Sequence, residues 1–180
     1  MAQFNLISNG NTNIQTVFRY ELKFPAPTAV KGQLQDSLSI YCTSAQIPRA
    51  AQTPIDWHAP MGVIAHQAGK RVIEPIALEF VVAADSTQAV NIFTMMSTWY
   101  NTTFDITTGY NLGKANYAVD NVQLLLKDGS YNTVHTFSLF RAFPTAAEFG
   151  TLNSEGSDLL KATMTLTYDY FKLDGLGTSV

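Results

Sequence analysis

Charged side chains are unusually scarce in this sequence. Lysine, arginine, aspartate and glutamate make up 14% of the 180 residues, whereas soluble domains usually reach about a quarter. So little charge indicates that much of the surface is covered, and another copy of the chain is the simplest cover. The net charge of −3 also argues against nucleic-acid binding, because such binding depends on clustered positive charge.

Cysteine and long hydrophobic runs are lacking as well. Cys42 is the only cysteine, which excludes an internal disulfide and a cysteine-rich zinc site. No apolar run is long enough to span a bilayer, and residues 1–10 lack the charged and hydrophobic regions of a secretion signal. We therefore expect a cytosolic, reduced and assembly-prone protein with no membrane partner.

The length of the chain suits a single domain with a real core. We expect a polar N-terminal arm over residues 1–16, a single β-domain over residues 17–173 and a free C-terminal tail over residues 174–180. The arm is rich in asparagine and glutamine, which is typical of a segment outside the core.

The most regular pattern runs from Asp158 to Phe171, where apolar and polar side chains alternate. Because side chains of a strand point to opposite faces with a period of two, the alternation predicts one long strand with a buried face and a wet face. Helical spacing would mix the two sets. The apolar set is Leu160, Ala162, Met164, Leu166, Tyr168 and Tyr170. The polar set is Lys161, Thr163, Thr165, Thr167 and Asp169.

Similar alternation predicts further strands over residues 17–24, 38–45, 73–83, 122–126 and 133–143. Pro144 is expected to end the last of these strands, since proline cannot donate to a sheet ladder, and a loop is expected to follow. Asp128-Gly129 predicts a hairpin between the last two strands. Cys42 falls on the apolar face of the second strand, which indicates a small core residue of low reactivity.

One helix is expected, from about Thr87 to Tyr100. Asp85 or Ser86 can cap its first turn. Apolar residues at spacings of three, four and seven form a stripe that seats the helix on a sheet. The members of this stripe are Ile92, Phe93, Met96 and Trp99. Residues 101–116 are polar and punctuated by glycine, so we expect them to cross the surface.

Residues 46–69 break the strand pattern, and prolines interrupt them. Long irregular segments in compact domains are usually functional. Short strands over Thr53–Ala59 and Val63–Ala68 would make an extended hairpin around Pro60 and Gly62, and an apolar projecting hairpin suits docking. The alternative is a hairpin that folds back over its own core. The apolar residues of this segment are Ile55, Trp57, Met61, Val63 and Ile64.

Together these elements predict a mainly β fold. It is an antiparallel β-sandwich or partly open barrel of six or seven strands, with one α-helix packed at its side and a long projecting β-hairpin. Such a domain leaves sheet edges open. The threonine-rich last strand has few features that block an edge, so we expect it to pair with another copy.

Residues with catalytic or metal-binding chemistry do not converge in the sequence. Asp56 lies near one histidine, but the third histidine belongs to a distant hairpin, so we expect no metal site. Neither a GxSxG elbow nor a phosphate-binding glycine loop is present. Glu148 and Glu155 flank glycines and are interpreted as solvated carboxylates. We predict no catalytic residue, no cofactor and no enzyme activity. The histidines are His58, His66 and His135.

Five short segments within residues 17–173 occur in an order that resembles that of a known family. They are Cys42–Pro48 at a strand end, Ala68–Arg71 after a long hairpin, the helix that ends near Trp99, the aromatic-proline turn Phe143–Ala147 and the closing segment Tyr168–Phe171. In this order they resemble the tail tube proteins of contractile-tailed bacteriophages. The arm and the insertion at residues 101–116 depart from the family pattern.

The resemblance implies a structural virion protein whose hexameric rings stack into the inner tail tube. In the family, paired strands of all subunits line the channel, and the long hairpin reaches the adjacent ring. The polar set Lys161, Thr163, Thr165, Thr167 and Asp169 would then face the lumen. The hairpin residues Ile55, Trp57, Met61, Val63 and Ile64 would connect the rings.

The resemblance also implies the partners. They are other copies of the chain, a contractile sheath protein, and tube terminator and baseplate proteins. DNA would pass through the lumen during ejection without specific binding, which agrees with the lack of positive charge. The tube would belong to the virion tail and would be assembled in the host cytoplasm.

Two other interpretations stay open. The chain could be a ring subunit of a type VI or extracellular injection tube, which shares this fold and carries protein cargo; neighbouring capsid and portal genes would separate the two. It could also be a monomeric β-sandwich that binds carbohydrate or peptide through Trp57. Sedimentation would separate a monomer from a tube subunit.

Overall fold

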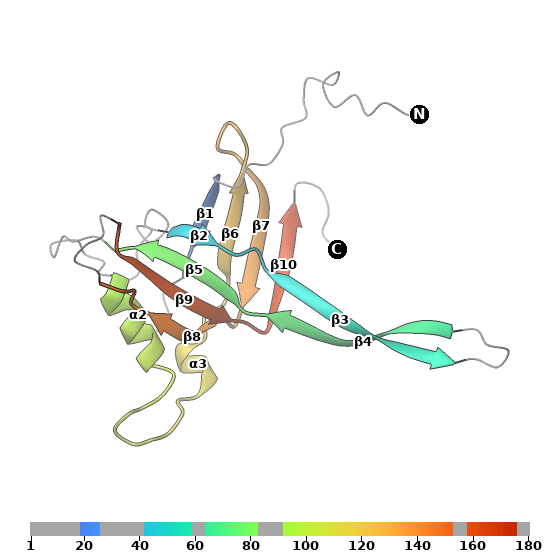
Figure 1. Cartoon of the computed structure of the whole chain (residues 1–180), viewed down its shortest axis with the longest axis horizontal. Helices are drawn as coiled ribbons and strands as arrows, with labels where there is room; N and C mark the ends of the chain where they lie inside the picture. Colours follow the sequence, from blue (N-terminus) through green and yellow to red (C-terminus); the bar gives the residue numbers. More distant parts are fainter. Residues whose placement is uncertain (1–18, 26–41, 59–63, 83–91, 153–157, 176–180) are drawn as a thin grey trace.

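Two four-stranded antiparallel sheets, a two-stranded hairpin and two helices make up the part of the chain that the structure describes (Figure 1). The structure is a computed structural model, and the described residues are 19–25, 42–58, 64–82, 92–152 and 158–175. The predicted fold class is confirmed: the chain is mainly β, with open antiparallel sheets, a helix at their side and a projecting hairpin.

Each sheet joins strands that are distant in the sequence. The β7 sheet has the order β1-β6-β7-β10 and consists of β1 (Tyr20–Lys23), β6 (Val122–Lys127), β7 (Thr133–Phe140) and β10 (Tyr170–Gly175). The β9 sheet has the order β2-β5-β9-β8 and consists of β2 (Cys42–Ala45), β5 (Ile76–Val81), β9 (Lys161–Thr167) and β8 (Phe143–Glu148). The other elements are β3 (Arg49–His58), β4 (Ile64–Glu74), α2 (Ile92–Asn101) and α3 (Lys114–Tyr117).

The core lies between the inner face of the β9 sheet, the β7 sheet and α2. α2 packs against β8 and β9, and its predicted apolar stripe is confirmed because Ile92, Met96 and Trp99 are buried. The central members of the core are at most 3% exposed. They are Leu22, Leu78, Phe80, Met95, Met96, Trp99, Val122, Leu124, Leu139, Met164 and Leu166.

A short second helix follows the surface crossing that was expected at residues 101–116. The crossing is closed by a bridge between Phe104 and Asn111, and α3 begins at Lys114. The Trp99 indole N–H donates a 2.8 Å hydrogen bond to the carbonyl of Tyr117. This bond joins the two helices. No helix in the described ranges is long and apolar enough to cross a membrane.

The predicted long last strand is divided, which corrects the sequence analysis. β9 ends at Thr167 in one sheet, and β10 begins at Tyr170 in the other. The backbone N–H of Asp169 bonds to the carbonyl of Phe140 at the point of transfer. Tyr168 is buried as predicted, but Tyr170 is 44% exposed because it follows this change of sheet.

The strand predicted over residues 133–143 is also divided, and Pro144 does not end a strand. β7 ends at Phe140, a corner at Arg141 follows, and β8 then runs through Pro144, which lies opposite Leu166. β8 is the outer strand of its sheet, with a register shift after Pro144. Proline is tolerated there because an edge strand needs fewer donors.

The predicted hairpin between β6 and β7 is confirmed, although its turn is longer than two residues. The Asp128 carboxylate accepts hydrogen bonds from the backbone N–H groups of Ser130 and Asn132, both at 2.8 Å. The residue in the left-handed region is Tyr131, with φ of 63°. An aspartate that binds its own loop in this way makes an Asx turn.

Several predictions fall on residues outside the described ranges. These residues are 1–18, 26–41, 59–63, 83–91, 153–157 and 176–180. They include the arm, most of the second predicted strand, the cap of the first helix, Glu155, Met61 and Val63. β10 includes Asp174 and Gly175, so a strand extends into the start of the expected tail.

Replacing Leu166 by alanine should lower the free energy of unfolding by about 2–5 kcal/mol, because a fully buried side chain leaves a cavity when it is removed. Leu166 is 0% exposed. Urea unfolding of unassembled subunits, followed by circular dichroism, measures the effect. Thr165→Ala, on the opposite face of the same strand, is the control and should change the stability by less than about 1 kcal/mol. Equal losses for both variants would contradict the assignment of faces.

Candidate assembly surfaces

The outer face of the β9 sheet is lined with threonine. Ala162, Met164 and Leu166 point into the core, so the residues between them point outward. Thr163 lies between Glu79 on β5 and Glu148 on β8, and Thr165 lies between Ala77 and Ala146. We call this surface the threonine face. Its residues are Ala77, Glu79, Ala146, Glu148, Lys161, Thr163, Thr165 and Thr167.

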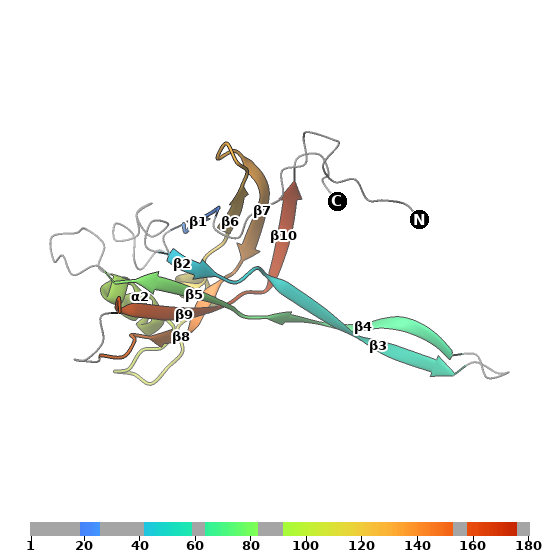
Figure 2. The ribbon, with the colours of Figure 1, turned by 45° about the horizontal axis from the view of Figure 1, so that its top comes forward.

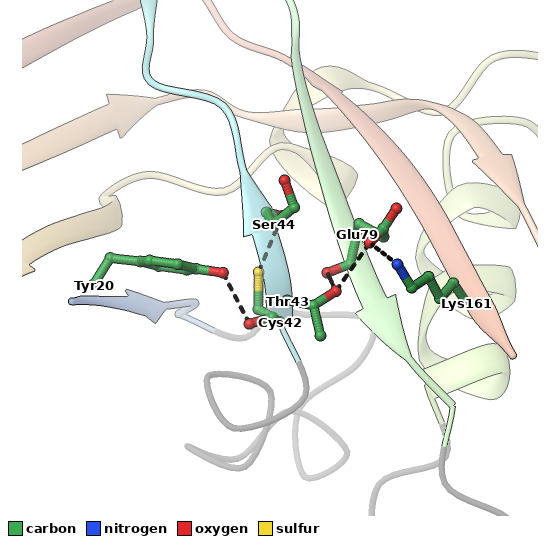
Figure 3. Close-up of polar contacts among 6 residues, drawn as sticks. All are labelled: Tyr20, Cys42, Thr43, Ser44, Glu79 and Lys161. Carbon is green, nitrogen blue, oxygen red and sulfur yellow. Dashed lines mark hydrogen bonds and ion pairs between the residues drawn. The ribbon is translucent and has the colours of Figure 1, made fainter. Parts of the chain in front are cut away.

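Charges on the threonine face are partly neutralised within the face. The Lys161 ammonium lies 3.0 Å from the Glu79 carboxylate, and the Thr43 hydroxyl donates to the same carboxylate at 3.1 Å (Figure 3). The hydrogen bond from Lys161, and then that from Thr43, holds the pKa of Glu79 below its usual value. With Glu148 as the second carboxylate, the face has one cation and two anions and is weakly acidic.

The edge strand β2 is hydrogen-bonded to β1 of the other sheet through Cys42, the first residue of the Cys42–Pro48 segment. The Tyr20 hydroxyl on β1 donates a 3.0 Å hydrogen bond to the carbonyl of Cys42, and the Cys42 thiol contacts the carbonyl of Ser44 at 3.4 Å (Figure 3). Burial raises the pKa of the Cys42 thiol to about 11. The thiol therefore stays protonated at neutral pH, and Cys42 is the small core residue that the sequence predicts.

Asp169 is separated from the threonine face by the end of β9. Its carboxylate lies 2.5 Å from the Lys114 ammonium and 3.6 Å from the Arg141 guanidinium. These contacts hold it against α3 and the corner between β7 and β8. The structure therefore groups four of the five polar residues of the predicted strand and places Asp169 at a corner.

Both edges of the β9 sheet are open in the described part of the chain. β2 and β8 are its outer strands, and no other described strand pairs with their outer sides. The threonine-rich strand β9 pairs with β5 and β8 on its two sides, so the expectation that this strand offers the edge to another copy is wrong. An open edge presents unpaired N–H and C=O groups, which readily pair with another chain. The sheet therefore has the means for edge-to-edge association at both ends.

The hairpin β3–β4 extends away from both sheets, in the turned view as well (Figure 2). Residues 51–58 of β3 are all exposed, and Ile55, Trp57 and Ile64 are 56%, 62% and 52% exposed. The alternative, in which the hairpin folds back over its own core, is wrong for these residues. Near its base, Arg71 lies over the ring of Phe171, 5.7 Å from the ring centre.

The apolar residues of the hairpin are divided between its two faces. Ile55 pairs with Gln67 and Trp57 pairs with Ala65, so these four residues share one face, which we call the Trp57 face. Ile64 lies on the other face, opposite His58. The sequence could not separate Ile64 from Ile55 and Trp57, because that requires the register of the two strands.

A β-bulge interrupts the hairpin at Gly69. Gly69 and Lys70 together lie opposite Thr53, since the register passes from Gln52–Arg71 to Pro54–Ala68. A Cβ on Gly69 would come within 2.2 Å of the Thr53 carbonyl oxygen, so only glycine fits. The Ala68–Arg71 segment is therefore part of β4 and contains this bulge.

The histidines of the hairpin do not form a metal site with the other described residues. The His66 imidazole lies 2.7 Å from the Asp56 carboxylate, on the face opposite Trp57. His135 is on β7 in the β7 sheet. No group of three or more possible ligands is found among the described side chains.

Three solved structures are similar to this chain over nearly its whole length. One is of the anti-feeding prophage cap, with a TM-score of 0.64 at 16% identity, covering 94% of this chain and 99% of that chain. Two come from the extracellular contractile injection system PVC. The structure of its sheath/tube terminator has a TM-score of 0.64 at 16% identity, covering 92% of this chain and 99% of that chain. The structure of its sheath-tube complex has a TM-score of 0.62 at 15% identity, covering 97% of this chain and 99% of that chain.

These similarities define the class of the fold, which is that of components of contractile injection systems. The phage tail tube protein family matches residues 13–174. The chain therefore belongs to the phage tail tube protein family, and the resemblance noted in the sequence is confirmed. No curated protein matches it.

Titration of Glu79 tests the ion pair on the threonine face. Its NMR titration midpoint in unassembled subunits should lie below the ordinary glutamate value of about 4.3, and Lys161→Ala should raise it. Because the folded pKa is lowered, the pair stabilises the fold above the ordinary pKa and loses this effect as the pH falls through the lowered value. Lys172→Ala, in the other sheet, is the control. A midpoint that Lys161→Ala leaves unchanged would contradict the pairing.

Proposed function

We propose that this chain is the structural subunit of the inner tail tube of a contractile-tailed phage. Hexameric rings of the chain stack into the conduit through which DNA is ejected into the host. The observation that carries the proposal is the β9 sheet of a tail tube family member, which has a buried face, a threonine-rich outer face and two open edges. In this proposal the chain forms the tube wall and the contacts between subunits, and it catalyses no reaction.

Ring closure uses the two open edges. The β2 edge of one copy pairs with the β8 edge of the next, which places different surfaces of two identical chains in contact. Such a head-to-tail contact closes into a ring when the rotation between copies fits a full turn. Charged residues make up only 14% of the chain, which is consistent with a surface that neighbouring copies largely cover.

The threonine face lines the lumen in this proposal. The threonine hydroxyl groups bind water at the wall but bind phosphate only weakly, and the Lys161 ammonium is paired with Glu79. A wall that lacks a cationic groove lets DNA move, because affinity for DNA depends mainly on contacts between basic residues and phosphates. We restrict the lumen residues to Lys161, Thr163, Thr165 and Thr167. Asp169 is engaged at its corner by Lys114 and Arg141.

Stacking uses the hairpin. Ile55 and Trp57 are large, apolar and exposed in the single chain, and an isolated subunit gains stability by burying them against a neighbour. A strand of ten residues such as β3 is about 33 Å long, so the hairpin can carry these side chains well away from its own sheets. Met61 and Val63 belong to the same proposed connector by their place in the sequence.

Further partners follow from the same assignment. The similar structures include a tube-terminating cap, a sheath-tube complex and a baseplate. We infer that this tube also lies inside a sheath and meets a terminator at one end and a baseplate at the other. Its place is then the virion tail, assembled in the host cytoplasm.

The second candidate is a tube of an extracellular injection system that carries protein cargo. It is favoured by the similarity to the anti-feeding prophage and PVC structures. Neighbouring genes for a capsid and a portal would support the phage tube, and their absence would support the injection system. A monomeric binding module is the third candidate, and it would remain small in sedimentation at all concentrations.

Electron microscopy of the purified protein tests assembly directly. Hollow tubes or hexameric rings are the expected result, with tubes of uniform diameter at high protein concentration. Particles that stay monomeric at every concentration and salt condition would refute the tube function.

A cysteine introduced at Thr165 tests the lumen. In assembled tubes the new thiol should react with a small maleimide but only slowly with a bulky one, since a narrow channel excludes large reagents. In unassembled subunits both reagents should react. Ser130→Cys, at the exposed turn between β6 and β7, is the control on another surface. Protection of Thr165→Cys tubes from both reagents would mean that the threonine face is buried in a contact.

Trp57→Ala tests the connector. Because Trp57 is 62% exposed and aromatic anchors carry much of the binding energy at interfaces, the variant should fold normally and form rings or single subunits, but no long tubes. Tyr131→Ala removes an aromatic side chain that is also well exposed (75%) from the turn between β6 and β7 and should still give tubes. Tubes of normal length from Trp57→Ala would show that the hairpin is not the connector.

A further inference from the structure

A groove runs along the exposed flank of α2. It consists of two adjoining hollows of about 470 Å³ and 430 Å³ that share Thr98. The α2 residues that line it are polar: Thr94, Ser97, Thr98 and Asn101. Aromatic and aliphatic residues stand at its two ends. Phe93 and Phe149 lie at one end, and Phe104, Ile106 and Leu112 lie at the other.

The loop at one end of this groove is held by its own hydrogen bonds. The Asp105 carboxylate accepts bonds from the Thr107 N–H at 2.8 Å and the Thr108 hydroxyl at 2.7 Å. The Asp105 N–H bonds to the Tyr110 carbonyl at 3.0 Å. These bonds engage the one carboxylate among the residues that line the groove. They also fix Ile106, which is 77% exposed, so the groove is organised before any partner binds.

The occupant of such a groove should be apolar, uncharged and projecting. The Trp57 face of the hairpin has these properties, since Ile55 and Trp57 are flanked on that face by Gln67 and Ala65. The other face of the hairpin carries the Asp56–His66 pair and His58. The single carboxylate of the groove is engaged by its own loop, so the groove complements the first face, and its described lining offers no cationic side chain to the Asp56 carboxylate of the second face.

The positions of the two surfaces also match. The hairpin lies at one end of the long axis of the molecule, and α2 with its following loop lies at the other end (Figures 1 and 2). A contact between the two ends of successive copies is head-to-tail, and such contacts build an open stack when the rotation between copies does not close a ring. Both hollows are open to solvent, so large side chains of another copy can reach them.

We propose that the groove along α2 is the receptor for the Trp57 face of the hairpin from a copy in the neighbouring ring. This inference rests on the proposed function and adds to it the surface that the hairpin binds. It assigns the groove to a second copy of the chain, because both complementary surfaces are exposed on the same molecule. It also gives a role to part of the insertion at residues 101–116, which departs from the family pattern.

Cross-linking between two single-cysteine variants tests this contact. Gln67→Cys lies on the Trp57 face and keeps both apolar anchors, while Ala68→Cys is the next residue and lies on the opposite face. Each is mixed with Thr98→Cys, assembled, treated with a short bis-maleimide and analysed by denaturing gel. We expect several-fold more cross-linked dimer with Gln67→Cys than with Ala68→Cys. Native Cys42 is 8% exposed, and the parent protein serves as its control.

A second variant tests the groove without cysteine. Thr98→Trp fills the point shared by the two hollows and should prevent long tubes while the subunit stays folded. If tubes form normally with Thr98→Trp, or if cross-linking is equal for Gln67→Cys and Ala68→Cys, the groove is not the receptor, although the tube function stands. If the parent protein forms no rings or tubes at all, the proposed function fails and this inference fails with it.

Discussion

Burial of one face of β9 is the interaction on which the rest of the structure depends. β9 lies between β5 and β8, and its Ala162, Met164 and Leu166 are fully buried under α2 and the β7 sheet. Because side chains alternate, this burial places Thr163 and Thr165 on the outside. A register slip of one residue would bury hydroxyl groups and expose methionine and leucine. One strand therefore specifies both the core and the surface proposed to line the channel.

Two corners let the chain pass between the sheets, and they lie side by side. Arg141 joins β7 to β8 with φ of 54°, a left-handed conformation that is unfavourable for a residue with a side chain. Its backbone N–H is held by the Asp120 carboxylate at 2.9 Å, and its guanidinium lies 3.6 Å from Asp169 at the second corner. Local hydrogen bonds and charge pairing thus offset the backbone strain of the change of sheet.

Much of the fold is readable from the sequence because burial produces periodic patterns. The faces of β9 and the stripe of α2 follow from such patterns, whereas the projecting hairpin was inferred from a segment that breaks the pattern. The end of β9 is different, since apolar and polar residues go on alternating through Tyr168 and Tyr170 while the strand changes its partner. Pro144 likewise marks the end of a strand only if that strand is central, and its edge position is a property of the whole sheet.

The candidate surfaces were predictable only in part. The members of the threonine face on β9 are evident from alternation, whereas its members on β5 and β8 depend on how these strands pair with β9. The two faces of the hairpin depend on a register that contains a bulge, and so Ile64 was grouped with Ile55 and Trp57 although it points the other way. The groove along α2 combines a helix flank, a loop and the residue after β8, and no single stretch of sequence shows it.

The bulge at Gly69 divides the hairpin into an inner part that packs on its own domain and an exposed outer part. Below it, Ile73 packs against the core of its own domain; beyond it, Gln67 and Ala65 accompany Ile55 and Trp57. The extra residue shifts the alternation of β4 by one position relative to β3. The orientation of the outer part is therefore set independently of the packing of the inner part. The outer surface can change its partner through substitutions there while the inner part keeps its packing.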